Sequence, residues 1–454
     1  MTEHDENPDA CVRTEMARWT VPGIAVGVLH NGETSTFGYG VASLETGFPV
    51  RPDTLFQVGS ISKLFVATMI MQLVEQGRVE LDAPIVTYLP DLRLADAGAQ
   101  QTITLRHLLT HTSGLYGDCF DDHGWGDDAL TNFVASFHKL RQITAPGELW
   151  TYCNSGFGMA GLVIERVLDM PFEQAVRERI FAPLGMDHSF YFAHEAIAYP
   201  AAVGHTQVEV FGDAHEVARK YPLPRSSNPA GGIISNVGDL LRFAAFHMGD
   251  GRAGDTRLLT SESIRAMRQP QVSAGSRAET WGIGWEIKTS DGVQIVGHGG
   301  ATNGFNARLT LVPERQFALA ILTNSGRGAA AYQRIAPWAL QHFCGLKQPE
   351  PAPVTLSDEE LARYAGTYTQ PLATVTMRVV DGGLEMVERN ISALTGQQRE
   401  LPPLHAHPVG NHTFMIDSAG QAEGEKFAFI FGDGRLPRFA RIGGRLSDRV
   451  HTEN

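Results

Sequence analysis

The order of the predicted secondary structure constrains the fold of this chain more than any other feature. Strand-like segments occur near the start, in "GIAVGVLHNGETSTFGYGVA", and again from Gly284 onward, in "GWEIKTSDGVQIVGHGG" and "NARLTLVPERQFALAILTN". Segments between them, such as "GFGMAGLVIERVLDM" and "SNVGDLLRFAAFHMG", carry apolar residues at helical spacing. Strands at both ends with helices between them predict an α+β domain: one antiparallel sheet built from both ends, beside a helical half.

Turn residues mark where the predicted strands reverse. Asn31-Gly32 and Asp291-Gly292 separate apolar runs, and both dipeptides favour two-residue hairpin turns because their residues tolerate positive φ. A third hairpin is expected to turn at Pro313 to Arg315, and a helix is expected to follow as far as about Phe343.

A proline-rich stretch, "KQPEPAPV", divides the chain. It has the composition of a stiff linker, and 454 residues are enough for two domains. Beyond it, alternating segments with Gly-rich turns predict strands. We therefore predict a first domain over residues 1–346, a linker over 347–355, and a smaller all-β, barrel-like domain over 356–450.

Charge and composition exclude several classes of function. The net charge is −13 without a basic run, so nucleic acid is not expected as a partner. The N-terminus, "MTEHDENPDAC", has neither the basic start nor the apolar core of a signal peptide, and no apolar run reaches the ~20 residues that cross a bilayer. The four cysteines form no CxxC pair. These features lead us to expect a cytoplasmic protein without a membrane span.

A candidate nucleophile lies at the start of a predicted amphipathic helix, in "QVGSISKLFVATMIMQLVEQG". A serine hydroxyl needs a neighbouring base, and residues three apart share one helix face, so Lys63 can reach Ser60. The helix N-terminus and burial would both disfavour the charged form of the lysine, as a base requires. By itself the S-x-x-K pattern is common by chance, and a helix-capping serine beside an exposed lysine is then the favoured interpretation.

Two further motifs favour catalysis. Tyr152-Cys153-Asn154 precedes a predicted helix, and His298-Gly299-Gly300 ends a predicted strand. In this order, S-x-x-K, Y-x-N and H-x-G resemble the serine β-lactamase and penicillin-binding-protein superfamily, most closely its class C branch with esterases and D-aminopeptidases. "ITLRHLLTHTSGL", "PAGGIISNVGDLLRF" and "WGIGW" fit that branch, roughly from Pro22 to Phe343, and "YAGTYTQP" resembles the start of an appended lipocalin-like barrel.

The resemblance implies roles for the catalytic residues. Ser60 would form an acyl-enzyme, and Lys63 would take or relay its proton. Tyr152 would act as general base toward Ser60 or the deacylating water. Which of Lys63 and Tyr152 is the base is left open. Asn154 would orient Lys63 and a substrate amide.

The third motif would bind the reacting carbonyl group. The backbone N–H groups of Ser60 and Ala301 would form the oxyanion hole. Gly299 and Gly300 would keep the strand edge bare, so that substrate can lie against it.

The sequence departs from the β-lactamase pattern at two positions. His298 stands where β-lactamases commonly carry lysine, and a mostly neutral histidine is a weaker partner for the carboxylate of a β-lactam or a peptide terminus. This departure favours esters or neutral amides as substrates. The middle of the second motif, Cys153, is interpreted as a buried filler.

Other features were weighed as competing sites. His107 and His111 have a zinc-like spacing, but the sequence lacks H-E-x-x-H and an evident third ligand, so a structural hydrogen-bonding role is favoured over metal. No serine occurs in G-x-S-x-G. We expect neither a metal nor an organic cofactor.

An aromatic and acidic run, "LYGDCFDDHGWGDD", occupies residues 115–128. It fits either a mobile loop over the active site, lined by Tyr116, Phe120 and Trp125, or a plain surface loop.

The sequence as a whole predicts a serine hydrolase that acts through Ser60 on small-molecule esters, amides or peptides. The alternatives are a β-lactamase, a penicillin- or peptide-binding relative with little turnover, and a scaffold whose β domain is the functional part.

Overall fold

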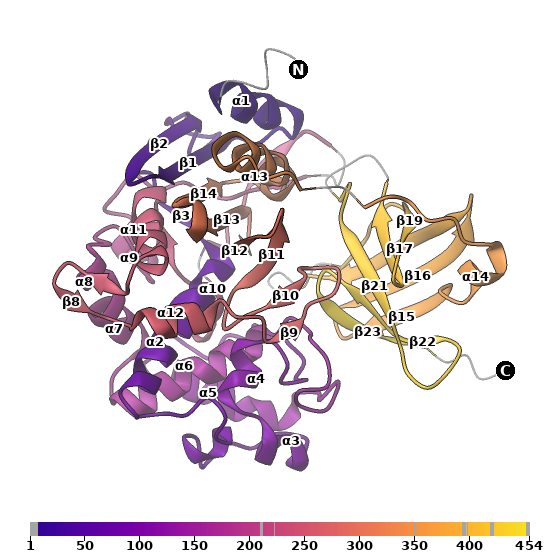
Figure 1. The fold of residues 1–454 in the computed structure, drawn as a ribbon, viewed down its shortest axis with the longest axis horizontal. Helices are drawn as coiled ribbons and strands as arrows, with labels where there is room; N and C mark the ends of the chain where they lie inside the picture. The colour runs from indigo at the N-terminus through magenta and orange to yellow at the C-terminus, as the bar shows by residue number, and fades with distance from the viewer. Residues whose placement is uncertain are drawn as a thin grey trace. The chain divides into compact units, whose positions relative to one another are not determined.

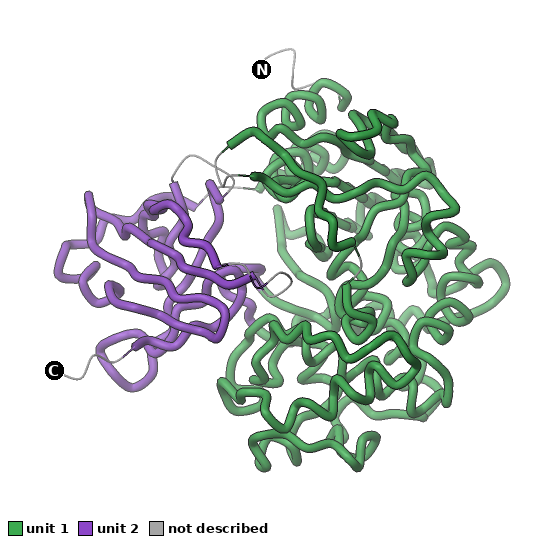
Figure 2. The backbone as a smooth tube through the Cα atoms, turned by 180° about the vertical axis from the view of Figure 1, so that it is seen from behind, with its two compact units in different colours: residues 1–272, 280–348 green, residues 273–279, 349–454 purple. Residues whose placement is uncertain are grey.

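The computed structural model describes residues 8–208, 212–221, 223–348, 351–392, 396, 398–417 and 422–450. The chain divides into two compact units, one of residues 1–272 and 280–348 and one of residues 273–279 and 349–454 (Figure 2). The predicted linker, 347–355, includes residues 349 and 350, which lie outside the described residues.

An eight-stranded sheet runs through the first unit (Figure 1). Strands from the two ends of the unit are neighbours in it, because β1 pairs with β14 in antiparallel register. The predicted α+β arrangement is therefore confirmed. The order across the sheet is β2 (Glu33–Gly40), β1 (Gly23–His30), β14 (Phe317–Thr323), β13 (Phe305–Val312), β12 (Val293–Thr302), β11 (Glu286–Ser290), β10 (Thr280–Trp281) and β9 (Val272–Ser273).

The predicted hairpin turns are present. Asn31 and Gly32 join β1 to β2 with φ values of 51° and 84°, and Asp291 and Gly292 join β11 to β12 with φ values of 50° and 78°. Two-residue hairpin turns with positive φ at both residues have a backbone twist that matches the twist of the flanking antiparallel strands. The third reversal is a 3₁₀ turn over Pro313–Arg315, between β13 and β14.

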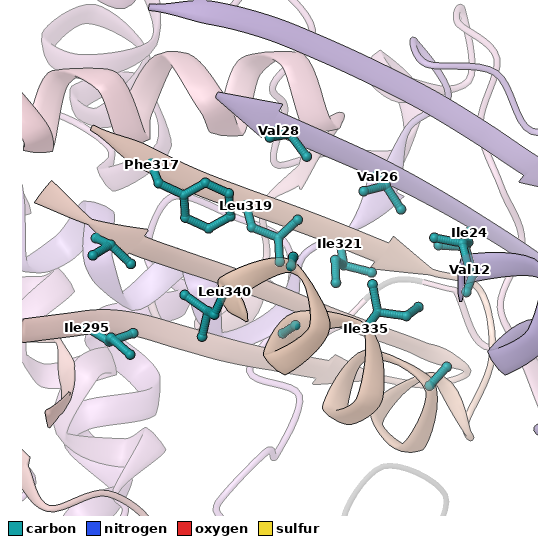
Figure 3. Close-up of a cluster of buried hydrophobic side chains, with 14 of the residues drawn as sticks. Val12, Ile24, Val26, Val28, Ile295, Phe317, Leu319, Ile321, Ile335 and Leu340 are labelled. Atoms are coloured by element: carbon teal, nitrogen blue, oxygen red, sulfur yellow. The ribbon is translucent and has the colours of Figure 1, made fainter. Parts of the chain in front are cut away.

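Helices cover both faces of the sheet. On one face α1 (Pro8–Arg18) and α13 (Gly328–Cys344) pack against alternate apolar residues, among them Val26 and Leu319, as Figure 3 shows. Gly27 points to the opposite face, where an added methyl group would lie 2.9 Å from side-chain atoms of α11 (Val237–Met248). Successive side chains of β1 therefore point to opposite faces of the sheet and contact a helix layer on each face.

The remaining helices form the helical half beside the sheet (Figure 1). They include α2 (Ser62–Glu75), α3 (Ala97–Thr102), α4 (Leu105–Leu109), α5 (Ala129–Ala135), α6 (Asn154–Leu168), α7 (Phe172–Val176), α8 (Ala182–Leu184), α9 (Ala193–Ala196), α10 (Asn228–Gly231) and α12 (Ser261–Met267). Three two-stranded antiparallel sheets pair β3 (Phe56–Gln57) with β6 (Ile234–Ser235), β4 (His205–Gln207) with β5 (His215–Val217), and β7 (Arg252–Ala253) with β8 (Thr256–Arg257).

The helix that carries the S-x-x-K motif differs from its prediction. It was expected to be amphipathic, but every residue from Ser62 to Leu73 is buried. Its polar residues are satisfied inside the protein: Thr68 Oγ1 donates to Leu64 O at 2.7 Å, and Gln72 Nε2 donates to Arg179 O at 3.3 Å. The sequence pattern was misleading because these polar residues face neighbouring elements rather than water.

The second unit is a closed β-barrel with a short helix, α14 (Asp358–Ala362). Eight strands form the ring, which closes because β16 pairs with β17, and β18 (Gln398–Glu400) adds to β17. Their order is β16 (Ala373–Val380), β15 (Gly366–Gln370), β23 (Arg445–Arg449), β22 (Pro437–Ile442), β21 (Lys426–Phe431), β20 (Thr413–Ile416), β19 (Leu404–Gly410) and β17 (Gly383–Ile391). The expected all-β, barrel-like domain is confirmed, and its interior holds a cluster of buried apolar residues that includes Tyr368 and Phe414.

Among the described helices, none has both the length and the apolar character needed to cross a membrane.

Candidate active site

Ser60 lies in a tight turn that is held from within. Gly59–Ile61 forms a 3₁₀ turn directly before α2, and Gly59 adopts a left-handed φ of 54° that favours glycine. The buried Ser62 hydroxyl donates to Gly59 O at 2.7 Å and accepts from Ile233 N at 3.1 Å. Ser60 itself is half-buried in this turn.

Lys63 lies within hydrogen-bonding distance of the Ser60 hydroxyl. Its Nζ lies 3.0 Å from Ser60 Oγ and donates to the carbonyl oxygen of Ala230 at 2.6 Å. The Lys63 side chain is fully buried, and its Nζ lies 5.0 Å and 5.5 Å from the ring centroids of Tyr152 and Phe157. The structural interpretation of the motif, an exposed lysine after a helix-capping serine, does not fit, because Lys63 is buried.

Strand β12 comes into direct contact with the turn of Ser60. A methyl group added at Gly300 would lie 1.9 Å from Val58 O and 3.0 Å from Ser60 N, and one added at Gly59 would lie 2.6 Å from Ala301 N. Because Gly59 and Gly300 have no side chains, the backbone segments that carry the amides of Ser60 and Ala301 can approach each other closely. Gly300 therefore allows this close approach of two backbones, which the sequence alone did not predict.

The part of β12 beside the turn is paired on one side by β13 and extends beyond its pairing with β11. The register with β11 ends at Gly297, whereas the register with β13 continues from His298 to Thr302. Gly299 lies within this extension and is buried, and Ala301 is exposed.

Tyr152 lies in a cluster of aromatic rings. It is 7% exposed, and its ring centroid lies 4.3 Å from that of His111, 6.2 Å from that of Trp281 and 6.2 Å from that of His298. Trp150 also contacts it, at 6.4 Å. The structure therefore brings the second motif and the third motif together with Lys63. Sequence reasoning did not single out Trp281, although the "WGIGW" segment contains it.

Asn154 and Cys153 begin helix α6. Asn154 Nδ2 donates to Asp118 Oδ1 at 2.8 Å, so this side chain links α6 to the run over 115–128; that contact was not expected from the sequence. Cys153 is fully buried, as expected, and its Sγ also caps the helix by accepting from Gly156 N at 3.3 Å. Burial raises the pKa of the Cys153 thiol to about 11, so the group is a neutral thiol at physiological pH.

His298 faces the site from β12. Its side chain is 1% exposed and is on the same face of the strand as Gly300, because the two are two residues apart. His298 Nδ1 lies 2.6 Å from Gly299 O, and a carbonyl oxygen can only accept, so Nδ1 carries the proton of this hydrogen bond. In the neutral ring Nε2 is then an acceptor, and only protonation makes it a donor.

The run over 115–128 is anchored by a buried arginine. Arg225 donates to Trp125 O and to Asp127 Oδ1, both at 2.7 Å, and pairs with the buried Glu173 at 3.1 Å. Trp125 is 49% exposed, while Tyr116 is buried and Phe120 is half-buried. Whether these three side chains contact substrate stays a prediction.

We expect Arg225→Met to destabilise the first unit, because it leaves the Glu173 carboxylate buried without its cation. Breaking a buried ion pair in this way typically costs about 3–5 kcal/mol. The exposed pair of Arg219 and Glu45 provides the control, since Arg219→Met should cost less than about 1 kcal/mol. Calorimetric melting of both variants tests this expectation, and an equal fall in the melting temperature would contradict it.

The two histidines that were weighed as metal ligands have hydrogen-bonding roles. His107 Nδ1 accepts from Thr104 N at 3.3 Å in the cap of α4, and His111 Nδ1 accepts from Cys153 N at 3.0 Å. Within the described part of the chain, no group of three or more histidine, cysteine, aspartate or glutamate side chains could hold a metal ion.

The comparison with known protein families agrees with this geometry. A family model described as Beta-lactamase matches residues 8–342. The chain belongs to the beta-lactamase family. Members of this family are generally serine hydrolases, and this chain is a hydrolase of the serine β-lactamase and penicillin-binding-protein type.

Relatives of this beta-lactamase-family chain span several named functions. It is 35% identical to "Penicillin-binding protein 4" of Amycolatopsis lactamdurans over 77% of this chain and 93% of that protein. It is 27% identical to a "Beta-lactamase" of Yersinia enterocolitica over 67% of this chain and 82% of that protein. A solved structure of SurE matches with a TM-score of 0.74 at 25% identity, over 98% of this chain and 99% of that chain, so the likeness in fold includes the barrel.

Proposed function

We propose that this chain hydrolyses carboxylic esters or neutral amides through an acyl-enzyme on Ser60. The observation that carries the proposal is the 3.0 Å contact between Lys63 Nζ and Ser60 Oγ, with Lys63 withdrawn from water. Because the Ala230 carbonyl accepts one N–H of Lys63, it orients the amine so that a lone pair of the neutral form can face Ser60.

The proposed reaction has two steps. In the first, Ser60 Oγ bonds to the substrate carbonyl carbon, its proton passes to Lys63 or Tyr152, and the leaving alcohol or amine departs with a proton. In the second, water attacks the acyl-enzyme, the bond to Ser60 Oγ breaks, and the acid is released. The backbone N–H groups of Ser60 and Ala301 would stabilise the oxyanion in both steps.

A second candidate function is a penicillin- or peptide-binding protein that is acylated but deacylates slowly. The 35% identity to "Penicillin-binding protein 4" favours it. Incubation with p-nitrophenyl butyrate and a cephalosporin, followed by mass spectrometry of the intact protein, separates the two. Turnover of the ester with a transient adduct supports the hydrolase. A persistent adduct without turnover supports the binding protein, and no adduct with either compound would contradict both.

His298 is proposed to set the choice between esters and β-lactams. An ester has no obligatory carboxylate, whereas a β-lactam presents one that must be held while its ring opens. With Nδ1–H engaged by Gly299 O, a neutral His298 offers Nε2 only as an acceptor, which cannot bind a carboxylate.

We therefore expect esters to react with a higher kcat/KM than cephalosporins. His298→Lys should narrow this difference by about tenfold, since a charged donor strengthens the interaction with the β-lactam carboxylate by ~1–2 kcal/mol. Steady-state kinetics of both proteins on p-nitrophenyl butyrate and a chromogenic cephalosporin measure this gap. Efficient cephalosporin hydrolysis by the unmodified protein would show that this ranking is wrong.

A further inference from the structure

We propose that His111 is a positioning residue that holds the Tyr152 ring in place beside Lys63. The inference rests on the proposed function, because it assigns His111 a part in the chemistry of Ser60. The proposed effect of His111 is on the place and orientation of the phenol.

The backbone on both sides of Tyr152 is hydrogen-bonded to His111. Thr151 N donates to the carbonyl oxygen of His111 at 2.9 Å, and Cys153 N donates to its Nδ1 at 3.0 Å. Two successive anchors that flank one residue fix the direction of its side chain, because few backbone torsions remain free between them. This holds Tyr152 more firmly than packing alone would.

The His111 ring also lies against the ring that it would position. The two centroids are 4.3 Å apart with an angle of 31° between the planes, which is a tilted stacking contact. His111 is fully buried, and its ring makes further edge contacts with Trp281 at 5.0 Å and Trp150 at 5.9 Å. Tyr152 therefore has one face covered by a ring that is itself held by two tryptophans.

The tautomer of His111 follows from its hydrogen bond. A backbone N–H can only donate, so Nδ1 of His111 accepts and carries no proton, and the ring is neutral with its proton on Nε2. Protonation of Nδ1 would abolish the bond to Cys153. A neutral ring can lie beside Lys63 and Tyr152 without adding a charge that would compete with theirs.

The backbone of His111 is strained. Its φ of 58° lies in the left-handed region, which residues other than glycine seldom adopt. Gly114, three residues later, is also left-handed, so the strain belongs to a sharp reversal after α4. This conformation is what allows one residue to present both its carbonyl oxygen and its Nδ1 to the segment of Tyr152.

Two variants separate the hydrogen bond from the ring contact. His111→Asn keeps an acceptor at the position of Nδ1 and tolerates the left-handed backbone, but it loses the ring. His111→Phe keeps a ring and leaves the buried N–H of Cys153 without its acceptor. We expect His111→Phe to lower kcat for p-nitrophenyl butyrate by roughly 10²-fold with little change in KM, as a displaced catalytic group does, and His111→Asn to recover a large part of the loss.

A second buried histidine provides the matched control. His247 is also fully buried, its Nε2 bonds Thr68 Oγ1 at 3.0 Å, and it contacts Phe243 and Trp285, but it lies on α11 without a bond to the Tyr152 segment. Burial lowers the pKa of His247 to about 3, so it too is neutral at physiological pH. His247→Asn should lower the melting temperature with little effect on kcat.

A double-mutant cycle decides whether His111 acts through Tyr152. If it does, His111→Phe should cost no further rate in a Tyr152→Phe background, because the group that it positions is gone. If His111→Phe does not fold, the same cycle is measured with His111→Asn. The inference would be overturned if the His111 variant lost as much kcat in the Tyr152→Phe background as in the unmodified protein. It would also be overturned if the His111 variant lost no more kcat than a His247→Asn protein of equal melting temperature. Either result leaves the proposed function standing as long as hydrolysis still depends on Ser60.

Discussion

Replacement of Ser60 by alanine is expected to abolish hydrolysis of p-nitrophenyl butyrate while the protein stays folded. Loss of a covalent nucleophile typically lowers kcat by several orders of magnitude. Ser60 is half-buried, and Lys63 keeps its bond to the Ala230 carbonyl without it, so the change removes one hydroxyl and leaves the packing around α2 in place. Steady-state kinetics, mass spectrometry of the acylated protein and a melting curve together test this expectation.

Ser62 is a matched control for the nucleophile. It lies two residues away and is fully buried, and its hydroxyl joins Gly59 O to Ile233 N instead of contacting Lys63. Ser62→Ala leaves Ile233 N without its acceptor, which should cost about 1–3 kcal/mol of stability. The Ser62→Ala protein should still form the acyl-enzyme. A Ser60→Ala protein that is folded and keeps most of its activity would refute the proposed mechanism.

The approach of Lys63 to Ser60 could be predicted because local spacing determines it. Ser60 and Lys63 are three residues apart, and a helical turn brings such residues to one face; the structure places the two groups 3.0 Å apart. The two-residue turns at Asn31-Gly32 and Asp291-Gly292 were predictable for the same reason, since a hairpin with that loop length requires residues that tolerate positive φ.

Contacts between distant segments could not be predicted in this way. The Ala230 carbonyl that holds Lys63 is a backbone group 167 residues away, and no side-chain pattern reports on a carbonyl oxygen. Arg225 was missed because its partners, Glu173 and Asp127, come from two other segments of the chain. Helix α2 was predicted to be amphipathic because its polar residues suggested an exposed face that the neighbouring elements in fact cover.

Histidine was the hardest residue type to interpret from the sequence. The spacing of His107 and His111 favoured a hydrogen-bonding role over a metal site, but only the fold shows which atoms lie nearby. At His298 the departure from the β-lactamase pattern was visible in the sequence, but the contact of its Nδ1 with Gly299 O was not. That contact decides what a neutral ring can offer to a ligand.

Tyr152→Phe is expected to lower kcat by about 10²–10⁴-fold, the usual contribution of a general base, with the fold retained. The Tyr152 ring is buried among His111, Trp281 and His298, and phenylalanine preserves every one of these ring contacts. The change therefore removes the hydroxyl alone. Initial rates and single-turnover acylation with p-nitrophenyl butyrate would show which of the two steps loses more rate.

The adjacent Cys153→Ala variant tests whether the chemistry belongs to the tyrosine hydroxyl or to this segment in general. Burial raises the pKa of the Cys153 thiol to about 11, so at neutral pH it is neither a thiolate nucleophile nor a base. Its Sγ caps helix α6 through Gly156 N, and loss of a cap costs about 1 kcal/mol. Cys153→Ala should therefore melt at a slightly lower temperature and keep kcat within a small factor of the unmodified protein. Losses of kcat that are comparable in Tyr152→Phe and Cys153→Ala would mean that the segment matters only for the shape of the site, and that Lys63 is the base without help from the phenol.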